Sequence, residues 1–133
     1  MNKLVLVDGA KGHTGTFLIK EILETRPEWN IIATDLPSIR RNELMAKETI
    51  FSTKFNYMTE ILENERISFI PADLTDKKSL INLFRDKQYD IIFHVASLYD
   101  YFAELDLLRK INVGGTRNLL ENIYETQNFV HLY

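Results

Sequence analysis

The chain has 133 residues, carries a formal charge of −3 and contains no cysteine. This length suits one domain with a real hydrophobic core, and the composition is that of an ordinary globular protein. The net negative charge argues against a nucleic-acid-binding surface, and the missing cysteines exclude disulfides and thiolate sites. Because no apolar run in the sequence approaches membrane-spanning length, we expect a cytoplasmic protein without a membrane partner.

The first strand and helix are joined by a glycine loop. Residues 3–7 are aliphatic, which predicts a strand buried on both faces. Gly9, Gly12 and Gly15 follow, and an apolar-periodic helix runs from there to near Pro27. In this context the first glycine permits a tight turn, the second lets backbone approach a pyrophosphate, and the third lets the helix pack closely on the strand. The loop and helix N-terminus therefore predict a phosphate site, with a turn that binds no ligand as the alternative.

A second aliphatic stretch, residues 30–34, ends at Asp35 and completes a βαβ unit. A carboxylate at this place can accept hydrogen bonds from both hydroxyls of an adenosine ribose. It would repel a 2′-phosphate 4 Å away by about 4 kcal/mol per unit charge pair at moderate dielectric, which favours NAD over NADP. Arg40 and Arg41 would soften this preference if the next loop folded back. The alternative for Asp35 is an ordinary strand-end aspartate.

Strands and helices continue to alternate along the rest of the chain. The elements predicted after Asp35 are two short helices within residues 40–65, a strand over 67–70, a helix capped by Thr75 or Asp76, a strand over 89–95, a helix extending to about Glu125 and a strand over 128–133. This order predicts an α/β fold with a doubly wound parallel sheet of the Rossmann type, five strands in the order 3-2-1-4-5. The ligand crevice would open at the carboxyl ends of the first and fourth strands.

Other polar residues follow the third and fourth strands. Asp73 could accept the adenine amino group while Leu74 covers the ring, or the aspartate could cap a helix. His94 is expected to be a hydrogen-bonded core histidine rather than a catalytic one, and the histidines are not spaced as metal ligands. Tyr99 and Tyr101 lie at the mouth of the expected crevice, where they either touch a substrate or begin the long helix.

Five motifs occur in the order typical of one enzyme family. They are Gly9-Ala-Lys-Gly12-His-Thr-Gly15, Asp35, Asp73-Leu74, His94-Val-Ala-Ser97 and Asn112-Val-Gly-Gly-Thr-Arg-Asn118. With them, the whole chain resembles the amino-terminal half of an extended short-chain dehydrogenase/reductase of the NAD-dependent epimerase/dehydratase family. The last two motifs are similar to the branch that contains dihydroflavonol reductases, 3β-hydroxysteroid dehydrogenases and nucleotide-sugar epimerases.

The resemblance implies a role in NAD binding for each matching position. The implied contacts are Gly9, Gly12, His13, Thr14 and Gly15 for the pyrophosphate, Asp35 for the adenosine ribose, Asp73 and Leu74 for the adenine, Val95, Ala96 and Ser97 for the ribose side of the cofactor, and Asn112 for the nicotinamide half. It also implies a small-molecule substrate, such as a sugar nucleotide, in the parent enzyme.

The catalytic residue pair of this family does not occur within residues 1–133. The family uses Tyr-x-x-x-Lys, and no tyrosine here has a lysine four residues later. We therefore expect residues 1–133 to be an NAD-binding portion truncated at the fifth strand, which binds a dinucleotide but catalyses nothing. An exposed fifth strand would favour homo-oligomers. The alternatives are a non-catalytic nucleotide-binding or redox-sensing module, and an S-adenosylmethionine site in a similar sheet.

Overall fold

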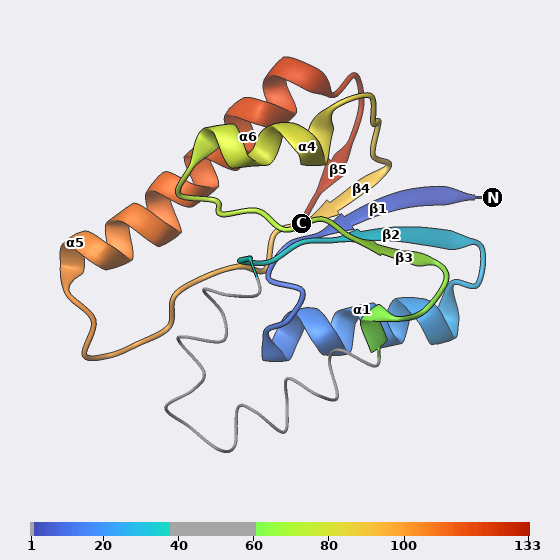
Figure 1. The fold of residues 1–133 in the computed structure, drawn as a ribbon, viewed down its shortest axis with the longest axis horizontal. Coiled ribbons are helices and arrows are strands. Elements are labelled where there is room, and N and C mark those ends of the chain that lie inside the picture. Colours follow the sequence, from blue (N-terminus) through green and yellow to red (C-terminus); the bar gives the residue numbers. More distant parts are fainter. Residues whose placement is uncertain (1, 38–60) are drawn as a thin grey trace.

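The computed structural model, shown in Figure 1, describes residues 2–37 and 61–133. Five parallel strands form one sheet in the order β3-β2-β1-β4-β5, which confirms the predicted Rossmann-type topology. The strands are β1 (Lys3–Val7), β2 (Trp29–Ala33), β3 (Ile67–Phe69), β4 (Ile91–Phe93) and β5 (His131–Leu132).

β4 is shorter than the predicted strand over residues 89–95. Beyond Phe93, the backbone N–H groups of Val95 and Ala96 turn toward the Asp8 carboxylate instead of a neighbouring strand. The strand therefore stops because a side chain replaces the ladder as hydrogen-bond acceptor. β5 is shorter than the predicted 128–133 as well, and it lies at the edge of the sheet with both residues exposed.

The helical elements follow the predicted order with different lengths. They are α1 (His13–Thr25), the 3₁₀ turn η1 (Lys77–Leu80), α4 (Ile81–Phe84), α5 (Leu105–Leu108), the π-helical turn η2 (Arg109–Gly114) and α6 (Gly115–Thr126). The predicted helix near Thr75 or Asp76 begins as a 3₁₀ turn, which Asp76 caps by accepting from the Lys78 N–H. The two helices predicted within residues 40–65 fall almost wholly on residues 38–60, outside the described part. Within the described part, no helix is long and apolar enough to cross a membrane.

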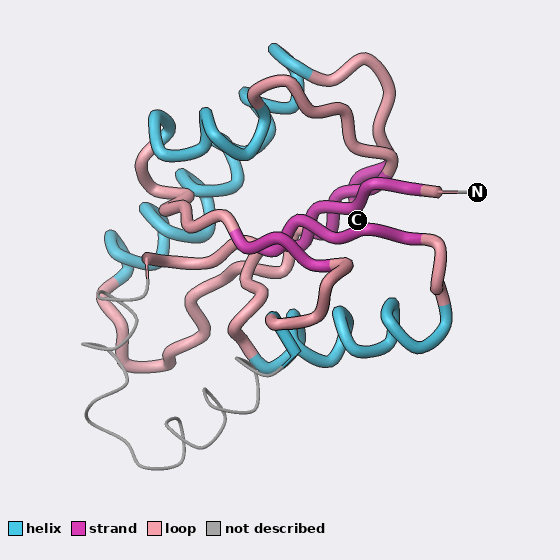
Figure 2. The backbone as a smooth tube through the Cα atoms, turned by 45° about the vertical axis from the view of Figure 1, so that its right-hand side comes forward, coloured by secondary structure: helices cyan, strands magenta, loops and turns pink. Residues whose placement is uncertain are grey.

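The sheet is covered by helices on both faces (Figures 1 and 2). Successive side chains of β1 point to opposite faces, so Val5 and Val7 pack with α1 while Leu6 packs with α4 and α6. The expectation of a strand buried on both faces is therefore confirmed. Not every apolar side chain of the helices faces the sheet, since Phe17 in α1 and Leu105 in α5 are 52% and 58% exposed.

The long helical segment predicted up to Glu125 is continuous from α5 to α6, with a π-helical turn between them. Gly115 begins α6 and is buried, and a Cβ built on it would lie 3.2 Å from the Leu74 Cβ. This small residue lets α6 approach the loop that follows β3. This packing fixes α6 beside the carboxyl end of the sheet.

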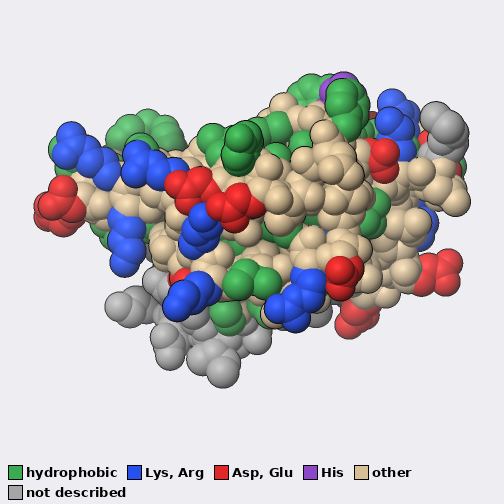
Figure 3. Space-filling model, turned by 90° about the horizontal axis from the view of Figure 1, so that it is seen from above, with side chains coloured by type: hydrophobic (Ala, Val, Ile, Leu, Met, Phe, Trp, Pro, Cys, Tyr) green, Lys and Arg blue, Asp and Glu red, His purple; other side chains and the backbone are tan. Residues whose placement is uncertain are grey.

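The outer surface over α4 and α6 mixes charges of both signs with apolar side chains (Figure 3). Lys77 forms ion pairs there with Glu121 and Glu125, both at 3.0 Å. All three side chains are exposed, so water screens these pairs and they add little to stability.

Candidate functional site

A hollow of about 770 Å³ lies at the carboxyl ends of β1, β2 and β4 and beside the loop after β3. Its volume lies in the upper part of the range of roughly 300–1,000 Å³ that is usual for ligand and cofactor sites. Its lining includes every predicted cofactor contact except Asn112: Gly9, Gly12, His13, Thr14, Gly15, Asp35, Asp73, Leu74, Val95, Ala96 and Ser97. The crevice predicted between the first and fourth strands is therefore present.

The glycine loop requires glycine at its first and last positions. Gly9 has a φ of +59°, and a Cβ on it would lie 2.9 Å from backbone atoms of Ala96. A Cβ on Gly15 would lie 2.1 Å from the Gly9 carbonyl oxygen. The loop thus packs directly against α1 on one side and against the end of β4 on the other. The predicted tight turn and close helix packing are both confirmed.

The N-terminus of α1 suits an anionic group. Gly12 is the residue before the helix and forms no side-chain cap, and the first turn carries no acidic residue. Thr14 and Gly15, in that first turn, line the hollow. Helix N-terminal N–H groups without a side-chain cap, together with the positive end of the helix dipole, favour phosphate. This end of the hollow fits a pyrophosphate.

Asp35 is held in one orientation by two backbone N–H groups. Its Oδ2 accepts from the Lys11 N–H at 2.8 Å, and its Oδ1 accepts from the Leu36 N–H at 2.7 Å. The side chain lines the hollow although the residue is only 9% exposed. A fixed, buried carboxylate next to a phosphate-binding loop fits an adenosine ribose.

Thr34, the residue before Asp35, provides an independent sign of a ligand. It lines the hollow and is 2% exposed, yet its hydroxyl has no hydrogen-bond partner within the described part of the chain. Buried hydroxyls nearly always have a partner, because leaving one unsatisfied costs about 1–3 kcal/mol. A polar group of a bound dinucleotide would meet this need.

Asp73 does not cap the following helix, since that role belongs to Asp76. Instead, the Asp73 Oδ1 accepts from the backbone N–H and the hydroxyl of Thr75, at 3.0 and 2.7 Å. Leu74 lies between the hollow and α6, where its carbonyl oxygen accepts from the Asn118 side chain at 2.8 Å. The loop after β3 is therefore anchored at the wall of the hollow where the adenine was expected.

The end of β4 is anchored to β1 through Asp8. The Asp8 Oδ1 accepts from the N–H groups of Val95 and Ala96, both at 2.6 Å, and its Oδ2 lies 2.6 Å from the His94 Nδ1. The other ring nitrogen of His94 lies 2.7 Å from the Thr116 hydroxyl. The expected hydrogen-bonded core histidine is confirmed.

Asn112, which was predicted to face the nicotinamide half of the cofactor, contacts the backbone of Leu98 and lines a separate hollow on η2 and α6. Its amide oxygen accepts from the Leu98 N–H at 2.7 Å and its amide nitrogen donates to the Leu98 carbonyl at 3.0 Å. The residue does not line the hollow at the carboxyl ends of the strands, whereas Leu98 does. Because both polar ends of the amide are engaged with Leu98, Asn112 shapes the wall of the hollow from behind it.

Sequence reasoning gave no role to several residues of this hollow. The additional residues are Asp8, Thr34, Leu36, Ala72, Thr75, Leu98, Leu107 and Ile111, and Tyr99 lines it too. Asp8 and Thr34 directly precede recognised motif positions at the ends of β1 and β2, so strand-end position was the available signal. The contacts of the others depend on where α5 and η2 pack. Within residues 2–37 and 61–133, no cluster of three His, Cys, Asp or Glu side chains could hold a metal ion.

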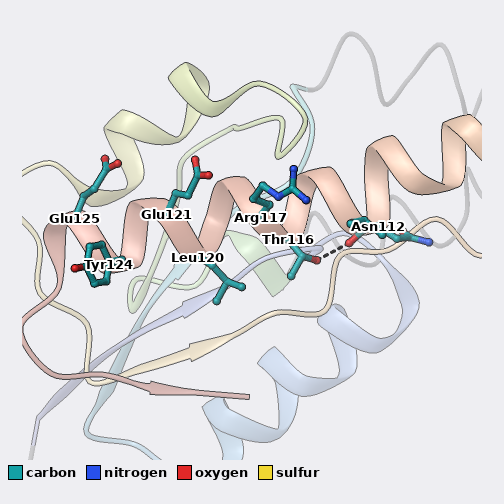
Figure 4. A pocket seen from close by; sticks show the side chains of 8 residues that line it. Asn112, Thr116, Arg117, Leu120, Glu121, Tyr124 and Glu125 are labelled. Atoms are coloured by element: carbon teal, nitrogen blue, oxygen red, sulfur yellow. Dashed lines mark hydrogen bonds between the residues drawn. The ribbon is translucent and has the colours of Figure 1, made fainter.

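A second hollow of about 590 Å³ lies on the outer face of η2 and α6 (Figure 4). Its lining comes from η2 and α6 alone and includes Asn112, Thr116, Leu120, Glu121, Tyr124 and Glu125 (Figure 4). It has neither the glycine loop nor a buried carboxylate. It therefore lacks the features that fit a dinucleotide.

The family model described as "Male sterility protein", an NAD-binding family, matches residues 7–132. An uncharacterized epimerase/dehydratase of Staphylococcus aureus (strain USA300) is 31% identical over 121 residues, which are 90% of this chain and 32% of that protein. The chain thus spans about a third of the length of the curated relatives it matches.

Solved structures share the fold at lower identity. A thiolation-reductase di-domain of an archaeal non-ribosomal peptide synthetase superposes with a TM-score of 0.72 and 20% identity, covering 98% of this chain and 34% of that one. ADP-L-glycero-D-manno-heptose-6-epimerase of Helicobacter pylori gives 0.71 and 20%, over 98% and 38%. dTDP-glucose 4,6-dehydratase of Bacillus anthracis, solved in complex with NAD, gives 0.68 and 19%, over 98% and 36%.

The fold, the lining of the hollow and the family match agree with one another. The glycine loop, the capless α1 and the fixed Asp35 carboxylate form the features of a dinucleotide site. The family model extends over nearly the whole chain. The chain belongs to the NAD-binding family described as male sterility protein.

Proposed function

We propose that this chain is the NAD-binding part of an enzyme that moves a hydride between NAD and a carbinol carbon of a sugar nucleotide or a related alcohol. The observation that carries the proposal is the Asp35 carboxylate, held at the end of β2 by the N–H groups of Lys11 and Leu36 beside the glycine loop. NAD, when bound, accepts a hydride from the carbinol carbon and can return it.

Each part of the hollow has a proposed share in holding NAD. The proposed contacts are Gly9, Gly12, His13, Thr14 and Gly15 for the pyrophosphate, Asp35 for the adenosine ribose, Asp73 and Leu74 for the adenine, and Val95, Ala96 and Ser97 for the ribose side of the cofactor. We assign Asn112 a positioning role, because its amide holds Leu98.

The substrate class is proposed from the names of the relatives. The curated relatives are named as epimerases/dehydratases, and the solved relatives include a nucleotide-sugar dehydratase and epimerase as well as a reductase. Because none of the tyrosines is followed by lysine four residues later, we expect the 133-residue chain to bind NAD without turning over a sugar nucleotide. Turnover by the purified chain with a panel of sugar nucleotides would contradict this.

The proposal is tested by calorimetric titration of the purified chain with NAD, NADP and S-adenosylmethionine. We expect NAD to bind at least about tenfold more tightly than NADP, since Asp35 repels the 2′-phosphate, and S-adenosylmethionine not to bind. Asp35→Asn should reduce the difference in affinity between NAD and NADP. Asp76→Asn, which alters a carboxylate outside the hollow, should leave it unchanged. Equal affinity of the wild-type chain for NAD and NADP would contradict the role of Asp35.

A further inference from the structure

Asp8 joins the two sides of the cofactor hollow from behind. It directly precedes Gly9, is 1% exposed, and accepts hydrogen bonds from the N–H groups of Val95 and Ala96 at 2.6 Å. Ala96 also packs closely on Gly9, because a Cβ built on Gly9 would lie 2.9 Å from the backbone of Ala96. The loop after β1 and the loop after β4 are therefore held together by one buried carboxylate.

The hydrogen bonds around His94 indicate its protonation state. An ionised carboxylate can only accept, so the His94 Nδ1, 2.6 Å from the Asp8 Oδ2, carries a hydrogen. The Thr116 hydroxyl donates its single hydrogen to the Asn112 carbonyl oxygen at 2.6 Å. It can then only accept from the His94 Nε2, 2.7 Å away. This hydrogen-bond pattern is that of an imidazolium ion, with hydrogens on both ring nitrogens and Asp8 as its counter-ion.

Asp8 is the charged side chain among the described contacts of His94. From α6 the ring contacts the neutral Thr116 hydroxyl, and beside β5 the His94 N–H donates to a main-chain oxygen of Tyr133 at 2.8 Å. The hydrogen bond to Asp8 raises the pKa of His94 above its ordinary 6.5, against a smaller lowering by burial. The pKa thus agrees with the hydrogen-bond pattern.

We propose that the Asp8–His94 ion pair is a positioning element of the cofactor hollow, which holds the Val95–Ala96 backbone against Gly9 and makes dinucleotide binding tighter when His94 is protonated. This inference rests on the proposed function, namely that the hollow binds NAD. When His94 loses a proton, the Thr116 hydroxyl must turn its hydrogen from the Asn112 carbonyl oxygen to the His94 Nε2, or one of the two ring bonds is lost. Asp8 is then a buried charge without a cation, which is costly and loosens the backbone it holds.

The direction of the pH dependence follows from the raised pKa. The stabilisation by the pair is fully present below about pH 6.5, the ordinary histidine value. It is lost as the pH rises through the higher pKa of the folded protein. By linkage, NAD affinity should fall over the same range, and NAD binding should raise the pKa of His94 further.

Asp8→Asn tests the charge with the hydrogen bonds retained. Its amide oxygen can accept from Val95 and Ala96, and its amide nitrogen can donate to a neutral His94. In the wild-type chain, we expect the Kd for NAD to rise about five- to tenfold between pH 6 and pH 9, and in Asp8→Asn to stay flat. Histidine-ring NMR, assigned with His94→Gln, should show His94 titrating above pH 6.5 in the wild type and below it in Asp8→Asn.

The control addresses His13, which also lines the hollow. A pH slope due to His13 would survive in Asp8→Asn, so an equal slope in both proteins would overturn the inference. A flat wild-type profile would overturn it too. If Asp8→Asn does not unfold cooperatively at pH 6, His94→Gln replaces it and should also give a flat profile. Absence of NAD binding at every pH would instead refute the proposed function, while an ordinary His94 titration would refute the ion pair itself.

Discussion

The two sides of the cofactor hollow are built by different means. On the β1–β2 side, backbone packing decides the shape, because Gly9 and Gly15 leave no room for a Cβ and Gly12 leaves α1 without a side-chain cap. On the β4 side, polar side chains form hydrogen bonds with the backbone: Asp8 with Val95 and Ala96, and Asn112 with Leu98. Substitutions on the β1–β2 side should therefore destabilise the chain through steric clash. Substitutions on the β4 side should destabilise it through loss of hydrogen bonds.

The largest effect is expected at the glycine-built side. Gly15→Ala places a Cβ 2.1 Å from the Gly9 carbonyl oxygen, a backbone atom that cannot move without displacing the loop. We expect the free energy of unfolding to fall by at least about 3 kcal/mol, and NAD binding to be lost. Chemical denaturation and calorimetry would measure the two effects.

Gly114→Ala is the matched control for this change. The nearest atom to a Cβ at Gly114 is the Arg109 carbonyl oxygen at 3.8 Å, an ordinary contact. Alanine in a helix should then stabilise the chain by about 0.5–1 kcal/mol. Equal destabilisation by both substitutions would contradict the steric account of the glycine loop.

An intermediate effect on stability is expected on the β4 side of the hollow. Asn112→Ala removes both hydrogen bonds to the Leu98 backbone, which should lower the free energy of unfolding by about 1–2 kcal/mol and weaken NAD binding. The neighbouring Val113→Ala, at a residue 56% exposed, should change stability by less than about 0.5 kcal/mol. If the two variants unfold at the same denaturant concentration, the hydrogen bonds between Asn112 and Leu98 do not stabilise the chain.

The smallest effect is expected at Thr34, and its sign is informative. Thr34→Val removes a buried hydroxyl that has no partner in the described part of the chain, so it should stabilise the free protein by about 1 kcal/mol while weakening NAD binding. Thr16→Val alters an equally buried threonine whose hydroxyl donates to backbone carbonyls. That change should destabilise the protein by about 1 kcal/mol. Destabilisation by both variants would show that the Thr34 hydroxyl is already satisfied without ligand.

The same contrast explains what the sequence made predictable. Glycine spacing is a local property of the chain, and the alternation of aliphatic and helical segments predicts a doubly wound parallel sheet, for which 3-2-1-4-5 is a common strand order. The sheet, the loop and the wall containing Asp35 could therefore be predicted. The expectation for His94 also held, because a polar ring between core residues needs partners.

The β4 side of the hollow depends on contacts between residues that are distant in sequence, and it was predicted less well. Asn112 was placed toward the cofactor, but its partner Leu98 is 14 positions away and meets it through the π-helical turn η2. Asp8 received no role, because its partners lie 86 to 88 positions further along the chain. The early end of β4 has the same origin, since Asp8 takes up the N–H groups that would have continued the ladder.

The most direct test of the central claim compares the two hollows of the molecule by NMR. Titration of the labelled chain with NAD should shift the backbone amide signals of Gly12, Thr14 and Ala96, which line the hollow at the carboxyl ends of the strands. The signals of Leu120 and Tyr124, which line the hollow on the outer face of α6, should not move. Shifts confined to Leu120 and Tyr124, or no shifts at millimolar NAD, would contradict the account.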